Sequence, residues 1–555
     1  MGAWEKMPGN KRTLNRRDQH GAMLYLTVLP AWCFLNVFIN LNYPAPLPSP
    51  MLLVLPSLEV WGVLLLLSLT PRITPPLAKG LYILLLVLLL GIRLFRVGDV
   101  VVPAYFNRPF NLYIDSGYIP HLLHLLWHSF SAWIVFSIAI VSVIGLVLVC
   151  WGLWISIRIT HRAFGQARLR HAFWALTTIE ALLVVSFIKG YLPDQLPPPG
   201  TACTPRLVEE IRFIATVDAV RHKTHAHIRE AATCARQFRR PLNLLGNADV
   251  HIFIIESYGL TLYDTPRHAE RFLPLAKAFN AAIARAGLKN YTSVMQSPTF
   301  GGASWLAFGT LESGVWLPDQ LRYYYLLTSS VAPLATYFNR AGYRSVSVMP
   351  GTTLPWPEGD YFGYSRRYYA KDFNYRGPPY GWSPMPDQYV LQTIHTREVE
   401  NSNKPLFIRY LLTSTHAPFN LQPRYIEDWD RIGDGSVYHQ QEPVTFPNNW
   451  PDLTEATEAY LTAMTYEFTV LQNYLAASSD DEALWIILGD HQPNAHITGP
   501  LKDALVPIHV ISRSERLLEP FCQAGYTPGI IPRMPPEPKR MDTFLIAFLS
   551  AYSSE

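Results

Sequence analysis

The feature that most constrains the fold is a series of apolar runs in the first third of the chain. Each run is close to the roughly 20 residues that a helix needs to cross a bilayer. A buried core helix could account for any one of them, and a cleaved signal peptide for the first, but neither accounts for all of them in succession. The sequence therefore predicts a five-helix transmembrane bundle, built on Met23–Asn40, Met51–Leu69, Leu81–Phe95, Ala132–Ile157 and Ala172–Ile188.

The positions of lysine and arginine predict how this bundle is oriented. Arg93 and Arg96, at the outer end of the third run, oppose the rest of the distribution but are outnumbered. Under the positive-inside rule the N-terminus is cytoplasmic, and an odd number of crossings exports the C-terminal part. We therefore expect a multi-pass protein of the inner membrane with a periplasmic or extracellular C-terminal domain. The basic residues that decide this are Lys6, Lys11, Arg12, Arg16 and Arg17 before the first run, and Arg158, Arg162, Arg168 and Arg170 after the fourth.

A proline-rich segment, Pro193–Gly200, marks the end of the membrane domain. We predict three parts: a transmembrane domain (residues 1–193), a linker and helical connector (194–245), and an exported domain (246–555). Cys203 and Cys234 fall on the exported side, where a disulfide can form, and the sequence leaves open whether they pair. A net charge of +4 over 555 residues gives no reason to expect a nucleic-acid partner.

In the exported part, short apolar runs alternate with helical patterns. This alternation is typical of an α/β fold, with a mostly parallel sheet flanked by helices on both faces. The predicted strands are Val250–Ile255, Ser345–Val348, Leu406–Leu412, Leu484–Leu488 and Val506–Ile511, and the predicted helices are Pro274–Ala286, Leu334–Ala341 and Thr454–Ala477.

Polar side chains directly follow three of these strands. They are Glu256, His416 and the pair Asp490-His491. Open α/β sheets bind their ligands beyond the carboxyl ends of the strands, and carboxylates and imidazoles are ligands of Zn²⁺ and Mn²⁺. Each residue alone could be a surface or capping residue, and only the convergence of several favours a metal site.

A glycine pair introduces a further candidate. Gly301 and Gly302 precede Ser304, which opens a predicted helix over Trp305–Leu311. A hydroxyl at a helix N-terminus can simply cap the helix, but it is also well placed to attack an anionic phosphorus or sulfur centre. With Glu256, Asp490 and His491 it would complete a tetrahedral shell around a metal, which would activate Ser304 as a nucleophile. Thr299 is a rival nucleophile.

Four ordered stretches resemble the alkaline phosphatase/sulfatase superfamily. Five membrane helices followed by such a domain are similar to its lipoteichoic acid synthase and lipid A phosphoethanolamine transferase branches. The fold that this resemblance implies is a sulfatase-like domain behind a membrane anchor. The stretches are Ile-Ile-Glu256-Ser, Gly-Gly-x-Ser304, Ser-Thr-His416-Ala-Pro-Phe and Leu-Gly-Asp490-His491.

The resemblance also implies roles for individual residues. Ser304 would be the nucleophile, where these transferases usually have threonine, and His416 would bind the substrate phosphate or protonate the leaving oxygen. Trp356, in Leu-Pro-Trp-Pro-Glu, resembles the tryptophan of a Trp-Asn-Arg segment in lipoteichoic acid synthases, so it would contact the substrate. The metal ligands would be Glu256, Ser304, Asp490 and His491.

Three departures from these families narrow the expectation. Ser304 is followed by Trp-Leu-Ala-Phe rather than by the x-Pro-x-Arg that directs formylglycine formation in sulfatases, which argues against sulfate ester hydrolysis. Pro357 stands where lipoteichoic acid synthases have asparagine, and Gln492 follows His491 where phosphoethanolamine transferases have glycine. The donor headgroup is therefore left open.

From these observations we expect a membrane-anchored, metal-dependent transferase. It would move a phosphoethanolamine- or phosphoglycerol-type unit from a membrane phospholipid to an envelope glycan or lipid, through a covalent Ser304 intermediate. Two alternatives stay open at this point: a phosphodiester or sulfate ester hydrolase that uses the same site, and a catalytically silent envelope scaffold.

Overall fold

The computed structural model falls into two compact units. One comprises Met1–Val101, Phe110–Leu112 and His121–Ile214, and the other Val102–Pro109, Tyr113–Pro120 and Ala215–Glu555. The residues that the structure describes are 16–41, 57–106, 108–120, 123, 127, 131–188, 204–236, 238, 241–354, 356–447, 453–477, 482–499 and 503–554.

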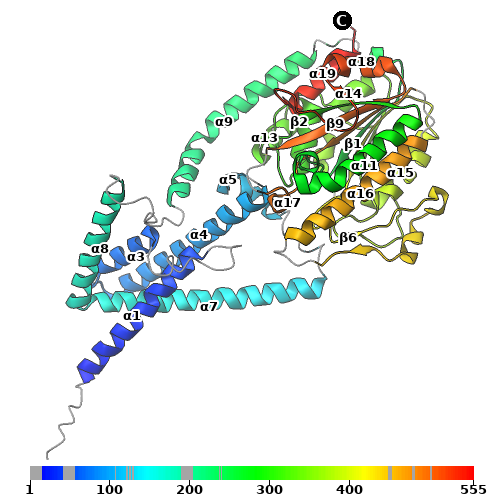
Figure 1. Ribbon diagram of the computed structural model, residues 1–555. Helices are drawn as coiled ribbons and strands as arrows, with labels where there is room; N and C mark the ends of the chain where they lie inside the picture. Colours follow the sequence, from blue (N-terminus) through cyan, green and yellow to red (C-terminus); the bar gives the residue numbers. More distant parts are fainter. Residues whose placement is uncertain are drawn as a thin grey trace, which may run out of the picture. The chain divides into compact units, whose positions relative to one another are not determined.

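Each of the five predicted apolar runs overlaps in sequence with a helix of the first unit (Figure 1). Among the described residues, two segments are long and apolar enough to cross a membrane, Pro75–Pro103 and Ala132–Phe164. The five-helix transmembrane bundle and its multi-pass topology therefore stay predictions. The five helices are α1 (Arg16–Asn40), α3 (Leu58–Leu69), α4 (Pro75–Phe106), α7 (Ala132–Phe164) and α8 (Ala167–Ile188).

Helix α3 is shorter than its apolar run because Ser57 caps it. The Ser57 side chain accepts a hydrogen bond from the backbone N–H of Val60, so the helix begins at Leu58 and has only 12 residues. All five helices nevertheless share one apolar cluster, since buried side chains from each pack together. Representative members are Leu35, Leu64, Leu89, Ile157 and Phe173.

The predicted connector contains a long helix, α9 (Thr204–Arg236). The proline-rich linker and Cys203 lie outside the described residues, and so does the side chain of Cys234. The domain boundaries at residues 193 and 245 stay predictions.

The second unit is built on a nine-stranded sheet, in the order β10-β2-β9-β8-β1-β5-β3-β4, with β11 also paired to β2. The sequence predicted the strands β1, β3, β5, β8 and β9 to within one residue at each end. The strands are β1 (Val250–Ile255), β2 (Lys289–Gln296), β3 (Arg344–Met349), β4 (Arg366–Tyr369), β5 (Leu406–Leu412), β8 (Leu484–Gly489), β9 (Leu505–Ser512), β10 (Thr527–Pro528) and β11 (Lys539–Arg540).

The sheet is mixed, whereas the sequence predicted one that is mostly parallel. The run β8-β1-β5-β3-β4 is parallel throughout. Beyond β8, however, β9 runs antiparallel to β8, and β2 runs antiparallel to β9. The prediction missed β2 because its buried and more exposed residues alternate, so it lacks the continuous apolar run of a fully buried strand.

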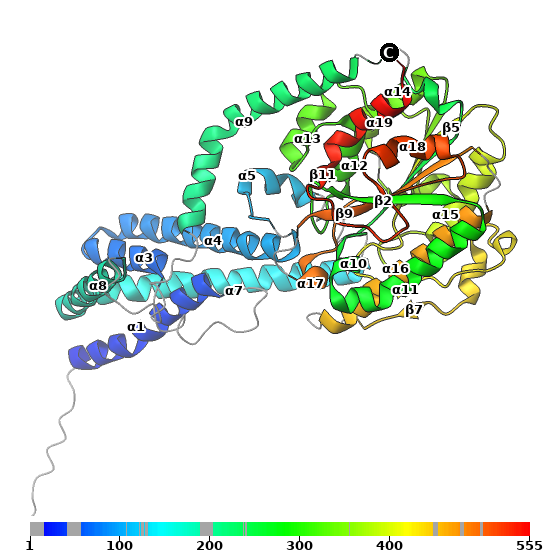
Figure 2. The ribbon, with the colours of Figure 1, turned by 45° about the horizontal axis from the view of Figure 1, so that its top comes forward.

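Helices cover both faces of the sheet, and β1 shows how the two faces are built (Figures 1 and 2). Phe253 and Ile255 pack in one apolar cluster with α11 (Pro266–Arg285), α15 (Asp387–Ile394) and α16 (Leu453–Ala477). Ile252 and Ile254 pack in another, with α12, α14, α18 and α19. Every residue of β1 is buried, as expected for a central parallel strand. The helices of the second face are α12 (Ser304–Ser313), α14 (Leu334–Arg340), α18 (Glu515–Gln523) and α19 (Phe544–Tyr552).

Shorter elements complete this unit. Helix α11 begins at Pro266 rather than at the predicted Pro274, because Pro274 lies inside the helix instead of at its first turn. The remaining α-helices of this unit are α10 (Thr261–Asp264), α13 (Gln320–Leu327) and α17 (Ala495–Thr498), and the remaining strands are β6 (Leu421–Gln422) and β7 (Val444–Thr445). Helix α5 (Leu112–Asp115) has its first residue in the first unit and the others in the second.

Candidate active site

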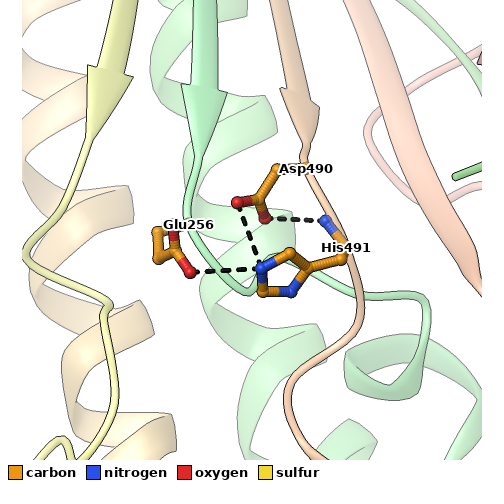
Figure 3. Close-up of side chains that lie close together, drawn as sticks. All are labelled: Glu256, Asp490 and His491. Carbon is orange, nitrogen blue, oxygen red and sulfur yellow. Dashed lines mark hydrogen bonds and ion pairs between the residues drawn. The ribbon is translucent and has the colours of Figure 1, made fainter. Parts of the chain in front are cut away.

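The site lies where the three central parallel strands end. In the register of the sheet, Ile255 of β1 stands opposite Leu412 of β5 on one side and Gly489 of β8 on the other. The three strands therefore end level with one another, and the residues that follow them emerge at the same edge. Figure 3 shows Glu256, Asp490 and His491 converging just beyond these strand ends.

These three side chains form a group that could hold a metal ion, because one ligand atom from each lies within 4.8 Å of the others. His491 is central, since its Nε2 lies 3.2 Å from Oε1 of Glu256 and 3.3 Å from Oδ2 of Asp490. Two carboxylates and one imidazole suit a borderline divalent cation such as Zn²⁺.

Backbone groups fix the orientation of these ligands. Oδ1 of Asp490 accepts hydrogen bonds from the backbone N–H groups of Ser257 (2.9 Å) and His491 (2.7 Å), so Oδ2 is the oxygen turned toward His491. Nδ1–H of His491 donates to the carbonyl of Gln492 at 2.7 Å, which leaves Nε2 to face the carboxylates. Such outer contacts orient metal ligands in proteins.

Gly489 allows β8 to approach β1 closely at this edge. A Cβ atom at position 489 would lie 1.8 Å from the backbone oxygen of Tyr258, which is far inside van der Waals contact. The segment after Glu256 therefore crosses directly over the end of β8 only because residue 489 has no side chain.

The charges of the three groups shift one another's pKa values. Burial alone would raise the pKa of Glu256, but the neighbouring His491 outweighs burial and lowers this pKa to about 2. Burial and the charge of Glu256 raise the pKa of Asp490 to about 8. Burial lowers the pKa of His491, but Asp490 and Glu256 together raise it to about 9. Both carboxylates thus face the same protonated imidazole nitrogen. A divalent cation in its place could be bound by all three side chains at once.

Ser304 is the first residue of α12 and not its N-cap. The N-cap position is Ala303, which makes no side-chain cap. The hydroxyl of Ser304 is turned toward the ligand group instead: Oγ donates to Oε2 of Glu256 at 2.9 Å and lies 3.3 Å from Nε2 of His491. The alternative that Ser304 only caps the helix does not hold, and the structure brings together all four residues that the sequence predicted as ligands.

The loop before Ser304 has an unusual backbone. Gly301, Gly302 and Ala303 have φ angles of 67°, 152° and 62°, a region that only glycine adopts readily. The N–H of Gly301 donates to the carbonyl of Gln492 at 3.0 Å. Thr299, the rival nucleophile, donates its hydroxyl to the carbonyl of Gly302 at 2.6 Å. The Gly301 bond ties the loop to the segment that carries His491, and the Thr299 bond holds the loop's own backbone.

His416 lies in the loop that follows β5, beside Glu256. The hydroxyl of Thr415 donates to the backbone carbonyl of Glu256 at 2.6 Å, and the positive charge of a protonated His416 contributes to lowering the pKa of Glu256. Sequence reasoning missed the indole of Trp382, which stacks on the His416 ring. Trp382 is 34 positions away along the chain, so no local pattern could have shown this contact.

Sequence reasoning also missed a buried carboxyl pair that supports this loop. Oδ2 of Asp387 accepts the backbone N–H of Ser414 at 2.6 Å, and the hydroxyl of Ser414 accepts the N–H of Asp387 at 3.0 Å. Glu467 of α16 faces Asp387, and both residues are fully buried. Burial raises the pKa of Asp387 to about 6, while burial and the charge of Asp387 raise that of Glu467 well above its usual value.

Trp356 packs against the aromatic side chains of the second sheet face. Its ring centroid lies 6.0 Å from that of Phe308 in α12 and 5.4 Å from that of Phe362. Its side chain is partly buried. The role of Trp356 in substrate binding stays a prediction.

The chain was compared with protein-family models, curated proteins and solved structures. The family model described as Sulfatase matches residues 252–505, and no curated protein matches the chain. Solved structures that match part of the chain include the lipoteichoic acid synthase LtaP from Listeria monocytogenes, with 13% identity over 54% of this chain and 76% of that one and a TM-score of 0.36.

Two further solved structures show the same degree of likeness. The zinc complex of the periplasmic domain of EptC from Escherichia coli has 17% identity over 49% of this chain and 74% of that one, with a TM-score of 0.33. The phosphoglycerol transferase GacH from Streptococcus pyogenes has 13% identity over 54% and 74%, with a TM-score of 0.34. TM-scores of this size add nothing to the family match.

Removal of one carboxylate ligand is expected to abolish metal binding without unfolding the protein. Asp490→Asn keeps the acceptor for the two backbone N–H groups but loses the negative charge, so we expect the affinity for Zn²⁺ to fall by about 100-fold or more. Metal content after dialysis, measured by mass spectrometry of the metal, checks this. The exposed Asp430→Asn serves as the control, and equal metal content in the two variants would contradict the site.

The buried carboxyl pair is expected to make stability depend on pH. Because folding raises the pKa values of Asp387 and Glu467, the folded state binds these protons more tightly than the unfolded state. Stability should therefore fall as the pH rises from about 4, the unfolded value, through 6 and above.

Glu467→Gln removes one titrating group, so the melting temperature of this variant should decline less steeply between pH 5 and pH 8 than that of the wild type. The exposed Glu537→Gln should decline like the wild type. Parallel curves for wild type and Glu467→Gln would show that the pair does not share a proton in this way.

Proposed function

We propose that this chain, whose residues 252–505 match the family model described as Sulfatase, transfers a phosphoryl-containing group through a covalent intermediate on Ser304. One observation carries the proposal: the Ser304 hydroxyl lies 2.9 Å from Glu256 and 3.3 Å from His491, at the N-terminus of a ten-residue helix. A hydroxyl in this position faces both the candidate metal ligands and the positive end of the helix dipole. Such surroundings favour a nucleophile that attacks an anionic centre.

Four of the site residues are proposed as metal ligands, and His416 is proposed as the proton carrier. Glu256, Asp490, His491 and Ser304 would hold a divalent cation, Zn²⁺ or Mn²⁺. When bound, this cation would lower the pKa of the Ser304 hydroxyl and offset negative charge on the phosphoryl oxygens. Thr299 is a weaker candidate for the nucleophile because its hydroxyl is already engaged with the Gly302 carbonyl.

The reaction would proceed in two displacements at phosphorus. In the first, the deprotonated Oγ of Ser304, whose proton would already have been released to solvent, would form a bond to phosphorus while the bond to the leaving alcohol breaks, and His416 would donate a proton to that leaving oxygen. In the second, the hydroxyl of an acceptor attacks phosphorus, the Oγ–phosphorus bond breaks, and His416 takes up the acceptor's proton. The chain returns to its starting state, so each turnover moves one group.

The proposed donor is a membrane phospholipid, and the leaving alcohol is then diacylglycerol. Two helices long and apolar enough to cross a membrane support this choice, because an anchored site would stay near a lipid donor. The proposed acceptor is a hydroxyl of an envelope glycan or lipid, and the proposed location is the outer face of the inner membrane. Trp356 is proposed to contact the donor headgroup. The lack of the x-Pro-x-Arg sequence after Ser304 disfavours a sulfate ester as the substrate.

A covalent adduct on Ser304 is the expected outcome of incubating the purified full chain with phospholipid vesicles and Zn²⁺ or Mn²⁺. Vesicles of phosphatidylethanolamine and of phosphatidylglycerol are compared, and peptides are analysed by mass spectrometry. The adduct should appear on the Ser304 peptide and its mass identifies the headgroup. Ser304→Ala should lack it and lose turnover on the order of 10⁴-fold.

Thr299→Ala is the matched variant, since it removes a neighbouring hydroxyl but keeps Ser304. It should still form the adduct. An adduct on Thr299 would contradict the assignment of the nucleophile. Release of free headgroup phosphate without any acceptor product would identify a hydrolase, and lipid left intact under every condition would identify a silent domain.

A further inference from the structure

The indole ring of Trp382 lies flat on the imidazole ring of His416. The two ring centroids are 4.0 Å apart and the planes are inclined by 12°. This is a close face-to-face stack, in which any tilt of the imidazole out of its plane would drive it into the indole. The stack therefore restricts how far the His416 ring can tilt.

A second contact restricts rotation of the same ring within that plane. Nδ1–H of His416 donates a hydrogen bond to the backbone carbonyl of Ala417 at 2.5 Å. This leaves Nε2 as the nitrogen that can exchange a proton with a substrate. One face and one edge of the imidazole are thus held by the protein.

The segment that carries Trp382 is built as a tight backbone turn. Tyr380 and Ser383 form an antiparallel bridge, with N–H···O distances of 2.9 and 3.1 Å in the two directions, and Gly381 has a φ of 61°. The Ser383 hydroxyl also lies 2.9 Å from that of Thr413, in the loop that leads to His416. The turn and the His416 loop are therefore joined independently of the ring stack.

Gly351 leaves the space that the indole occupies. A Cβ atom at this position would lie 2.6 Å from Cζ3 of Trp382 and 3.2 Å from Cγ2 of Thr413. Gly351 does not have a positive φ, so its backbone conformation does not require glycine. What a side chain at 351 would disturb is the position of Trp382.

We propose that Trp382 is a positioning residue for His416, an inference that rests on the function proposed above. By fixing the plane of the imidazole, the indole would hold Nε2 in line with the leaving oxygen, so that the proton is delivered as the bond to phosphorus breaks. The indole would raise the rate of proton transfer by orienting His416, and correct orientation of the proton donor accounts for a substantial part of general acid catalysis. Trp382 itself forms no bond to the substrate in this account.

The test compares two donors that differ in their need for that proton. The phospholipid has an alkoxide leaving group, which must be protonated, whereas an aryl phosphodiester such as bis(4-nitrophenyl) phosphate does not require protonation of its leaving group. In Trp382→Ala we expect kcat for the phospholipid to fall by about 10- to 100-fold with little change in KM, and turnover of the aryl ester to change little. Trp382→Phe retains a stacking ring and should recover most of the loss.

Three further variants separate positioning from packing. In a His416→Ala background, Trp382→Ala should have no additional effect on phospholipid turnover. Gly351→Ala should reproduce the selective loss in milder form and keeps the inference testable if Trp382→Ala does not fold. Trp429→Ala removes another partly buried tryptophan of this unit, which packs against Tyr474, and should leave the ratio between the two donors unchanged.

Other results would overturn the inference. Equal losses on both donors, a loss confined to KM, or additive effects of Trp382→Ala and His416→Ala would mean that Trp382 acts only through packing or through substrate binding. With any of these outcomes the Ser304 adduct would still form, so the proposed function would not be contradicted. Failure of the wild-type chain to process either donor would overturn both.

Discussion

Two buried carboxylates that face one imidazole nitrogen are the constraint on which the site depends. Oε1 of Glu256 lies 3.2 Å and Oδ2 of Asp490 lies 3.3 Å from Nε2 of His491, and the two carboxylates follow directly after the paired strands β1 and β8. The single charge of a protonated His491 offsets that of Glu256, and the pKa of Asp490 is raised to about 8 by burial and by the charge of Glu256. We propose that a divalent cation would be bound by all three side chains, with the Ser304 hydroxyl, which lies 2.9 Å from Glu256, as a further ligand and as the group to be activated.

The fold brings these groups together by ending three parallel strands at the same level. Gly489 lets the chain after Glu256 cross over β8, and the run of positive φ angles at Gly301–Ala303 turns the first residue of α12 toward the metal ligands. Hydrogen bonds from the Asp387 pair and the stack from Trp382 hold the third loop, which carries His416. The sheet thus positions the candidate metal ligands, while side chains from outside the sheet position His416, the proposed proton carrier.

Much of the sheet and of the candidate site could be predicted because both produce local patterns in the sequence. Fully buried strands appear as continuous apolar runs, so β1, β5 and β8 and the polar residues after them could be located from sequence. Strand β2 was missed because its buried residues alternate with more exposed ones, and β9 was located but its antiparallel direction was not predicted, because direction depends on neighbours far along the chain. Trp382 and Glu467 were missed for the same reason, since each acts through a residue distant in sequence.

The most direct test of the central claim is to locate the metal by anomalous X-ray scattering. Diffraction from crystals of the full chain, grown with Zn²⁺ or Mn²⁺, would be recorded on both sides of the corresponding absorption edge. We expect a single peak about 2.0–2.2 Å from ligand atoms of Glu256, Asp490 and His491, with Oγ of Ser304 in the same shell. A peak elsewhere, or a metal at this position that Ser304 does not reach, would contradict it.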